Sequence, residues 1–215
     1  MDEKPAASAT EQRRDYHHGD LRRALLKAAD AELTDKGVEG FSLRGVAKRA
    51  DVSHAAPAHH FGNTEGLLTA LAAEGFRRFI AKQEEREADA QNDPVSRHVA
   101  SGLGYVDFAL SNPALFNLMF TSERTDRDED ELCNAAAAAF DKLVSQTKDI
   151  VGRDPREDIS AMTDVVAAWA MVHGLASLMN SGRIAVLQDM PIDQRDRVLA
   201  DIISRSIADR ATDAI

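Results

Sequence analysis

Hydroxyl, imidazole and guanidinium groups gather in one short stretch of this chain, residues 41–71, which reads FSLRGVAKRADVSHAAPAHHFGNTEGLLTAL. Side chains of these types donate hydrogen bonds to the phosphate oxygens and base edges of DNA. The candidates for DNA contact with such a group are Ser42, Arg44, Ser53, His54, His59 and His60, and Ala55 is a further candidate beside His54. We expect Arg44, His54 and His59 to contact bases or phosphates, and the serines and His60 to position the chain on the DNA backbone. For His60, packing beside Phe61 is an equal alternative.

Two short helices joined by a tight turn would present these side chains together. Apolar residues at i, i+3, i+4 and i+7 predict a first helix with Ser42 as its N-cap; they are Leu43, Val46, Ala47 and Ala50. Asp51 tolerates the left-handed conformation of a sharp turn. A second helix is predicted over residues 53–61, with Ser53 as its N-cap and Pro57 at the end of its first turn. In DNA-binding proteins the second helix of such a pair enters the major groove, although the same pair also occurs in helical proteins that bind no DNA.

Residues 16–68 resemble the N-terminal domain of the tetracycline-repressor-like (TetR) family; they read YHHGDLRRALLKAADAELTDKGVEGFSLRGVAKRADVSHAAPAHHFGNTEGLL. The resemblance implies a helix-turn-helix domain over residues 16–62 that binds double-stranded DNA as part of a homodimer. Two positions depart from the family pattern. The family commonly has Tyr where Ala58 stands and Lys where Thr64 stands, and both contact phosphates. Their loss should weaken sequence-independent affinity and lower its salt dependence.

Charge does not mark the head as a basic domain. Residues 1–64 hold ten Lys and Arg against ten Asp and Glu, whereas residues 65–215 hold sixteen against twenty-six, so the net charge of −10 lies in the second part. DNA-binding domains are normally basic, so a neutral head counts against tight non-specific binding. Five of the seven histidines lie in the first part, and their protonation at mildly acidic pH would strengthen DNA binding.

Helical patterns continue to the end of the chain, and nothing has the β-branched and aromatic alternation of a strand. The sequence therefore predicts an all-α fold of about nine helices. The expected helices span residues 20–36, 42–50 and 53–61, one from 64 past 79, then 94–110, a short one from 113, then 130–151, 156–181 and 192–209. Polar, unpatterned residues 1–15 are expected to form a disordered arm, and residues 63–215 a ligand-binding and dimerisation domain.

Composition restricts the compartment and the chemistry. A single cysteine, Cys133, excludes an internal disulfide framework and fits a reducing compartment. No apolar run of roughly 18 residues and no signal-peptide pattern is present, so we expect a cytoplasmic protein without a membrane partner. No nucleophile, paired-carboxylate or phosphate-loop signature appears, and no third ligand completes a metal site with the paired histidines. We therefore expect no enzyme activity, no cofactor and no metal.

Two stripes in the C-terminal part suggest how the chain assembles. Small residues at helical spacing, from Ala167 to Ser181, would let another backbone approach closely, and the last helix carries an apolar stripe. Two such helices pairing with the same two of a second chain would form a four-helix dimer interface, which is also how the TetR family dimerises. The expected interface residues are Ala170, Gly174, Ser177, Leu199, Ile202, Ile203 and Ile207. The alternative is that both stripes are buried within one chain.

The segment WAMVHG, residues 169–174, places Trp169 and His173 on one helix face. It resembles the Trp-x-x-x-His-Gly signature in the C-terminal regulatory domain of one TetR subgroup, and the segment NPALFNLMF resembles another piece of that domain. A small-molecule pocket is therefore expected, for a small and mostly apolar effector. Its expected lining is Leu103, Phe108, Phe116, Met119, Phe120, Trp169 and His173. Each of these residues could instead belong to an ordinary core, and His173 could be a structural histidine.

Together these features predict a dimeric, ligand-responsive transcriptional regulator, a repressor that binds a palindromic DNA operator and is released by its effector. The alternative is a TetR-like small-molecule binding or protein-interaction module with weak or lost DNA binding, which the residues at Ala58 and Thr64 would suit. A helical hydrolase or metalloenzyme is a distant third.

Overall fold

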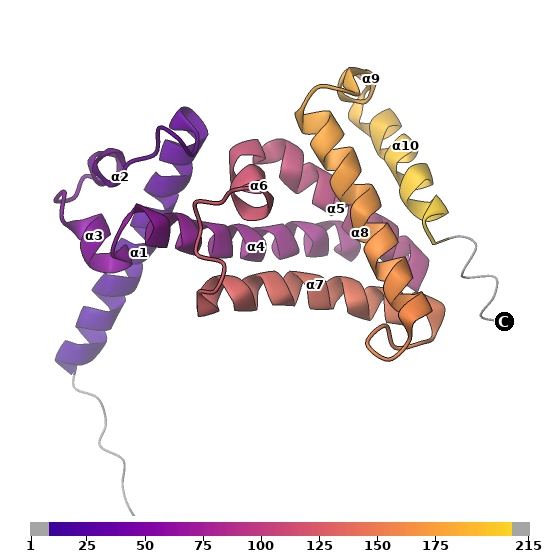
Figure 1. Ribbon diagram of the computed structural model, residues 1–215, viewed down its shortest axis with the longest axis horizontal. Coiled ribbons are helices and arrows are strands. Elements are labelled where there is room, and N and C mark those ends of the chain that lie inside the picture. The colour runs from indigo at the N-terminus through magenta and orange to yellow at the C-terminus, as the bar shows by residue number, and fades with distance from the viewer. Residues whose placement is uncertain (1–8, 208–215) are drawn as a thin grey trace, which may run out of the picture.

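The structure is a computed structural model that describes residues 9–207, and the side chains of residues 20–207. This part of the chain forms ten helices and no strand, which confirms the all-α prediction. The helices are α1 (Ala9–Lys36), α2 (Leu43–Arg49), α3 (Ala56–Phe61), α4 (Thr64–Ala88), α5 (Pro94–Ser111), α6 (Pro113–Phe120), α7 (Asp130–Val151), α8 (Ile159–Asn180), α9 (Ala185–Gln188) and α10 (Ile192–Arg205). Figure 1 shows a head of α1 to α3 at one end of the long α4, and a body formed by the remaining helices along the rest of α4.

The head follows the predicted turn chemistry, except at the start of α3. Ser42 caps α2, because its Oγ accepts a hydrogen bond from the Gly45 N–H at 3.1 Å. Asp51 has φ 53°, the left-handed value that the turn requires. The prediction that Ser53 caps the next helix was wrong: α3 begins at Ala56 and its N-cap, Ala55, makes no side-chain capping bond. Pro57 lies within the first turn, where its missing N–H leaves no bond unmade.

Most helix bounds agree with the sequence to within a few residues, and the differences have local causes. Helix α1 begins at Ala9 rather than at residue 20, so part of the expected disordered arm is helical, and residues 1–8 lie outside the described part. Helix α8 begins at Ile159 because Asp158 caps it, accepting the Ala161 N–H at 2.9 Å. The four-residue α9 is too short to show a periodic pattern.

Helix α4 joins head and body, and one glycine lets α5 lie close against it. A Cβ at Gly104 would stand 2.7 Å from the Gln83 Cα, so only glycine permits this approach. The buried core runs without interruption along α4, from Leu68 in the head to Phe79 in the body. Head and body therefore share one core.

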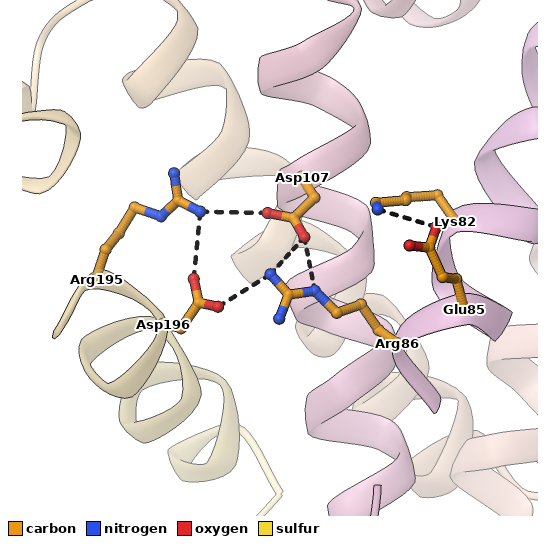
Figure 2. Close-up of polar contacts among 6 residues, drawn as sticks. All are labelled: Lys82, Glu85, Arg86, Asp107, Arg195 and Asp196. Carbon is orange, nitrogen blue, oxygen red and sulfur yellow. Dashed lines mark hydrogen bonds and ion pairs between the residues drawn. The ribbon is translucent and has the colours of Figure 1, made fainter. Parts of the chain in front are cut away.

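A ring of four alternating charges attaches α10 to the body (Figure 2). The Arg86 Nε of α4 donates to Asp107 of α5 at 2.7 Å, and Arg86 also lies 2.9 Å from Asp196 of α10. Arg195 of α10 completes the ring, 3.3 Å from Asp107 and 3.2 Å from Asp196. The ring fixes the rotation of α10 about its axis, so that Leu199 is buried inward, 1 % exposed.

Candidate functional sites

The first site is the outer surface of α2, α3 and the turn between them. Arg44, His54 and His59 are exposed, and so are Ser53 and Ala55, so these five candidates are available to DNA. The other two, Ser42 and His60, are half-buried.

Their partial burial has visible causes. The Ser42 hydroxyl is occupied as a helix cap and also lies 3.5 Å from the Glu32 carboxylate. The ring of His60 lies 6.2 Å from that of Phe61, in keeping with the packing alternative.

One cation near this surface is held by the head itself. Arg49 at the end of α2 donates through Nε to the buried Glu32 of α1 at 2.6 Å, and it also pairs with Asp35. These hydrogen bonds raise the pKa of Arg49 above its ordinary value. Lys48, one residue before, is exposed and is a candidate phosphate contact that the sequence reasoning missed. Lys48 could have been identified from its place in the last turn of α2, next to the loop that leads to α3.

The head is attached to the body by ion pairs at two positions along α1. Glu131 in the first turn of α7 accepts from Arg22 of α1 at 2.6 Å and from Arg77 of α4 at 3.0 Å. The Arg22 guanidinium also lies 5.4 Å from the ring centre of Phe61, the last residue of α3. About two turns further along α1, Asp30 pairs with Arg78 of α4 at 2.7 Å. The position of α3 is thus connected through Arg22 to the start of α7.

The second site is a cavity of about 700 Å³ enclosed by α4, α5, α6, α7 and α8. Four of the seven predicted lining residues lie on it: Met119, Phe120, Trp169 and His173. The volume falls within the usual range for small-molecule sites, roughly 300–1,000 Å³.

Three predicted lining residues lie elsewhere. Phe116 packs behind His173, with ring centroids 5.4 Å apart. Phe108 packs on Phe79 and borders a second, smaller hollow of about 270 Å³. Leu103 packs against the core. The face of α5 toward the cavity instead carries His98, Ser101, Gly102 and Tyr105. Three of these are polar and recur at helical spacing, whereas the lining expected of α5 from the sequence was only apolar.

Two titratable groups meet in the cavity wall. The Tyr105 hydroxyl and the His173 Nδ1 are 2.8 Å apart and share a hydrogen bond. Burial raises the pKa of Tyr105 and lowers the pKa of His173, so both side chains are neutral near pH 7. His173 therefore has a structural partner and also faces the cavity.

The inner wall, formed by α4 and α5, holds two buried polar side chains without a protein partner. His98 is 4 % exposed, and its Nδ1 has no hydrogen-bond partner among the described residues. Burial lowers the pKa of His98 to about 4, so the ring is neutral. Gln83 is 7 % exposed and lines the same cavity.

The third candidate site is the face of α8 that the body leaves exposed; two of its residues, Val166 and Ala170, also border the cavity. Ala170, Gly174 and Ser177 are not buried, and a Cβ at Gly174 would meet nothing within 4 Å. Large apolar side chains flank them: Val166 is 52 % exposed and Leu178 is 42 % exposed. By length and composition, α8 is apolar enough to cross a membrane, and a third of that apolar window (33 %) is buried. The expectation that no such run exists was therefore wrong.

Three of the expected interface residues on α10 are core residues instead. Leu199, Ile203 and Ile207 are 1 %, 0 % and 2 % exposed within a single chain, so they cannot contact a partner in this conformation. Their stripe is apolar because it packs inward on the body. Ile202 is half-buried, and Val198, at 36 % exposed, stands on the outer side of α10.

Comparisons with known proteins agree with this division into head and body. Residues 25–71 match the family described as bacterial regulatory proteins, tetR family, and residues 98–204 match the tetracyclin repressor-like C-terminal domain. The chain is 35 % identical to the HTH-type transcriptional regulator BetI of Burkholderia ambifaria (strain MC40-6) over 79 residues. This match covers 36 % of the present chain and 41 % of that relative. The match thus spans about two fifths of that relative's length.

Longer matches extend over the body. The BetI regulator of Burkholderia cenocepacia (strain ATCC BAA-245 / J2315) is 28 % identical over 161 residues, 67 % of this chain and 79 % of the relative. A solved protein of unknown function from Rhodococcus sp. RHA1 is 34 % identical, with a TM-score of 0.72 over 90 % of this chain and 98 % of that chain. With its head and its body both matched, the chain belongs to the TetR family of transcriptional regulators.

Proposed function

We propose that the chain is a cytoplasmic, non-enzymatic repressor that binds a palindromic operator as a homodimer and releases it when a small, mostly apolar effector fills the cavity. One observation carries the proposal: the cavity wall and the head meet at the first turn of α7. Leu132 and Cys133 line the cavity, and the preceding residue, Glu131, binds Arg22 of α1.

This arrangement supplies a route from effector to DNA. A ligand that displaces the start of α7 moves Glu131, and with it the Arg22 that lies over Phe61 at the end of α3. Two heads of a dimer that read one face of DNA need their recognition helices about 34 Å apart, one helical turn. An effector that favours another spacing lowers operator occupancy by shifting the population of dimers.

The first part of the test identifies the operator. A selection on random DNA with the full chain should enrich a palindrome with half-sites about one turn apart. Uncharged apolar compounds are then screened by the emission of Trp169, the one tryptophan of the chain, and each hit is tested for operator release. Enrichment of a palindrome followed by release with at least one hit supports the repressor; hits that never alter operator affinity contradict it.

The coupling route has its own variant and matched control. In Glu131→Gln the carboxylate between Arg22 and Arg77 is lost, and because these pairs are half-exposed the effector's influence on operator affinity should fall by about two- to fivefold. Glu85→Gln removes the same charge from a pair with Lys82, 3.0 Å away within α4, and should leave the influence unchanged. Equal effects of both variants would exclude Glu131 as the link.

A second function is favoured by the head's weak phosphate footprint. Ala58 and Thr64 lack the groups that the family commonly uses, and Arg49 is held by Glu32 and Asp35. A TetR-like ligand-binding or protein-interaction module with little DNA affinity would have such a head. In that case the selection on random DNA enriches nothing, while the ligand screen still yields hits.

A further inference from the structure

Three buried polar side chains lie on the inner wall of the cavity, which α4 and α5 form. Gln83 of α4, with His98 and Ser101 of α5, are 7 %, 4 % and 6 % exposed, and all three line the cavity. The outer wall is formed by α7 and α8, where Phe140 and Trp169 pack edge to face with centroids 6.1 Å apart. A ligand therefore meets buried hydrogen-bonding groups beside Phe76 and Phe79 on the inner wall, and the Phe140–Trp169 pair together with Gln146 and His173 on the outer wall.

The inner-wall groups are unusual because they lack partners in the protein. Buried polar side chains are nearly always hydrogen-bonded, since an unsatisfied one destabilises the fold. The His98 Nδ1 is buried without a partner, and the Gln83 amide makes no hydrogen bond to another described residue. A molecule in the cavity that hydrogen-bonds to both would satisfy them.

The wall carries no unpaired charge. The nearest carboxylate, Glu87, has a 7 % exposed side chain and is held by Lys142 at 2.9 Å and by the Gln146 amide, also at 2.9 Å. His98 is neutral, because the same burial disfavours its charged form. Burying a carboxylate or an ammonium group against this wall would leave that charge without a counter-ion, which is costly in an apolar environment.

We infer that the cavity is built for an uncharged, amphiphilic ligand: an alkyl or aryl body against the aromatic outer wall, and a hydroxyl or amide group hydrogen-bonded to His98 and Gln83. The inference rests on the proposed function, because it names the class of effector for the same cavity. Arg127, exposed at the other end of the cavity in the segment between α6 and α7, defines the competing orientation, in which an anionic group stays near solvent.

Four matched probes test this chemistry without DNA: 1-octanol, 1-chlorooctane, octanoate and octylammonium. Their binding to the full chain is measured by calorimetry and by Trp169 emission. We expect 1-octanol to bind at least about tenfold more tightly than either charged probe, and about two- to tenfold more tightly than 1-chlorooctane for each hydrogen bond made. Equal affinity for 1-octanol and 1-chlorooctane would overturn the inference, because the polar wall would then be unused.

Two nearly isosteric variants assign the hydrogen bond to His98. His98→Leu should lower 1-octanol affinity toward that of 1-chlorooctane, by the roughly two- to tenfold of one hydrogen bond, and leave 1-chlorooctane unchanged, whereas His98→Asn keeps a hydrogen-bonding group and should retain most of the preference. Arg127→Gln is the control and should change neither. Octanoate that binds most tightly and loses its affinity in Arg127→Gln would establish the opposite orientation and refute the inference.

The free protein gives a second readout. Since the buried His98 Nδ1 is unsatisfied without ligand, His98→Leu should raise Tm by a few degrees. A lowered Tm in this variant would mean that His98 stabilises the fold, and would count against a ligand-directed wall. If 1-octanol binds as expected but does not release the operator, the ligand class stands and the repressor proposal fails.

Discussion

An alanine methyl and a threonine hydroxyl stand where the TetR family commonly presents Tyr and Lys to DNA phosphates. Ala58 is exposed on α3, and Thr64 is the first residue of α4, so both positions have room for a longer side chain. Asn63 caps α4 independently of position 64, since its side chain accepts the Gly66 N–H at 2.8 Å. The two positions can therefore be altered without disturbing the helices.

Restoring both groups should tighten DNA binding. In Ala58→Tyr combined with Thr64→Lys, the added hydroxyl and ammonium group each gain a phosphate contact, and Thr64→Lys alone should steepen the slope of log K against log salt by about 0.9. Titrations of a DNA duplex at several salt concentrations measure this. No change in slope would mean that position 64 does not face DNA in this protein.

The buried His98 makes stability depend on pH. Its pKa is about 4 in the folded protein against 6.5 in the unfolded chain, so between these values the unfolded state binds more protons. Stability is complete above pH 6.5 and is lost as the pH falls toward 4, by about 2 kcal/mol between pH 7.5 and pH 5. Urea unfolding at both pH values should show this loss in the native chain and a smaller one in His98→Leu. Identical losses would show that His98 is already neutralised or solvated.

These two residue-scale cases differ in how far the sequence could anticipate them. Positions 58 and 64 were recognisable because residues 16–68 resemble the N-terminal domain of the TetR family, which commonly has Tyr and Lys there. The role of His98 could not be recognised from the sequence, because a histidine on a mostly apolar helix has the same local pattern whether it faces solvent, core or cavity. Its burial depends on how α5 packs in the folded chain, which the local pattern does not specify.

At the scale of helices, α8 and α10 show which apolar stripes remain uncovered. Leu199 and Ile203 are covered by the body, whereas Gly174, Leu178 and Val198 are not. A spacing of i, i+3, i+4 and i+7 predicts an apolar face but does not say what covers it. The sequence therefore identified both helices and assigned the stripe of α10 to the wrong neighbour.

Substitutions on the exposed face of α8 and α10 should disrupt the proposed dimer. Gly174→Leu should force two α8 helices apart, and Val198→Asp should place an unpaired charge in the seam, weakening dimerisation by about a hundredfold or more. Sedimentation velocity should then show monomers with a folded circular dichroism spectrum. Ile203→Asp is the contrasting variant: it should unfold the chain, because Ile203 is 0 % exposed within one subunit. Intact dimers in both open-face variants would refute this interface.

At the scale of the whole molecule, one continuous core and the ion pairs of α1 join the head to the body, and the proposed repressor couples them energetically. Binding at two linked sites is reciprocal, so an effector that weakens operator binding by a given factor must itself bind that much more weakly to the DNA-bound protein. Effector titrations followed by Trp169 emission, with and without saturating operator, should give a typical ratio of about 5 to 150. A ratio of one would mean that the cavity and the head are uncoupled.

Helix α8 belongs to two surfaces at once, since Trp169 and His173 border the cavity while Gly174 lies on the open face. In a dimer closed through that face, the two cavities would be separated by little more than a pair of helices, each about 10 Å across. Filling the first would then reshape the wall of the second. Gene expression would respond to rising effector concentration as a threshold rather than a gradual slope, so that traces of the compound leave the operator occupied and a modest further increase empties it.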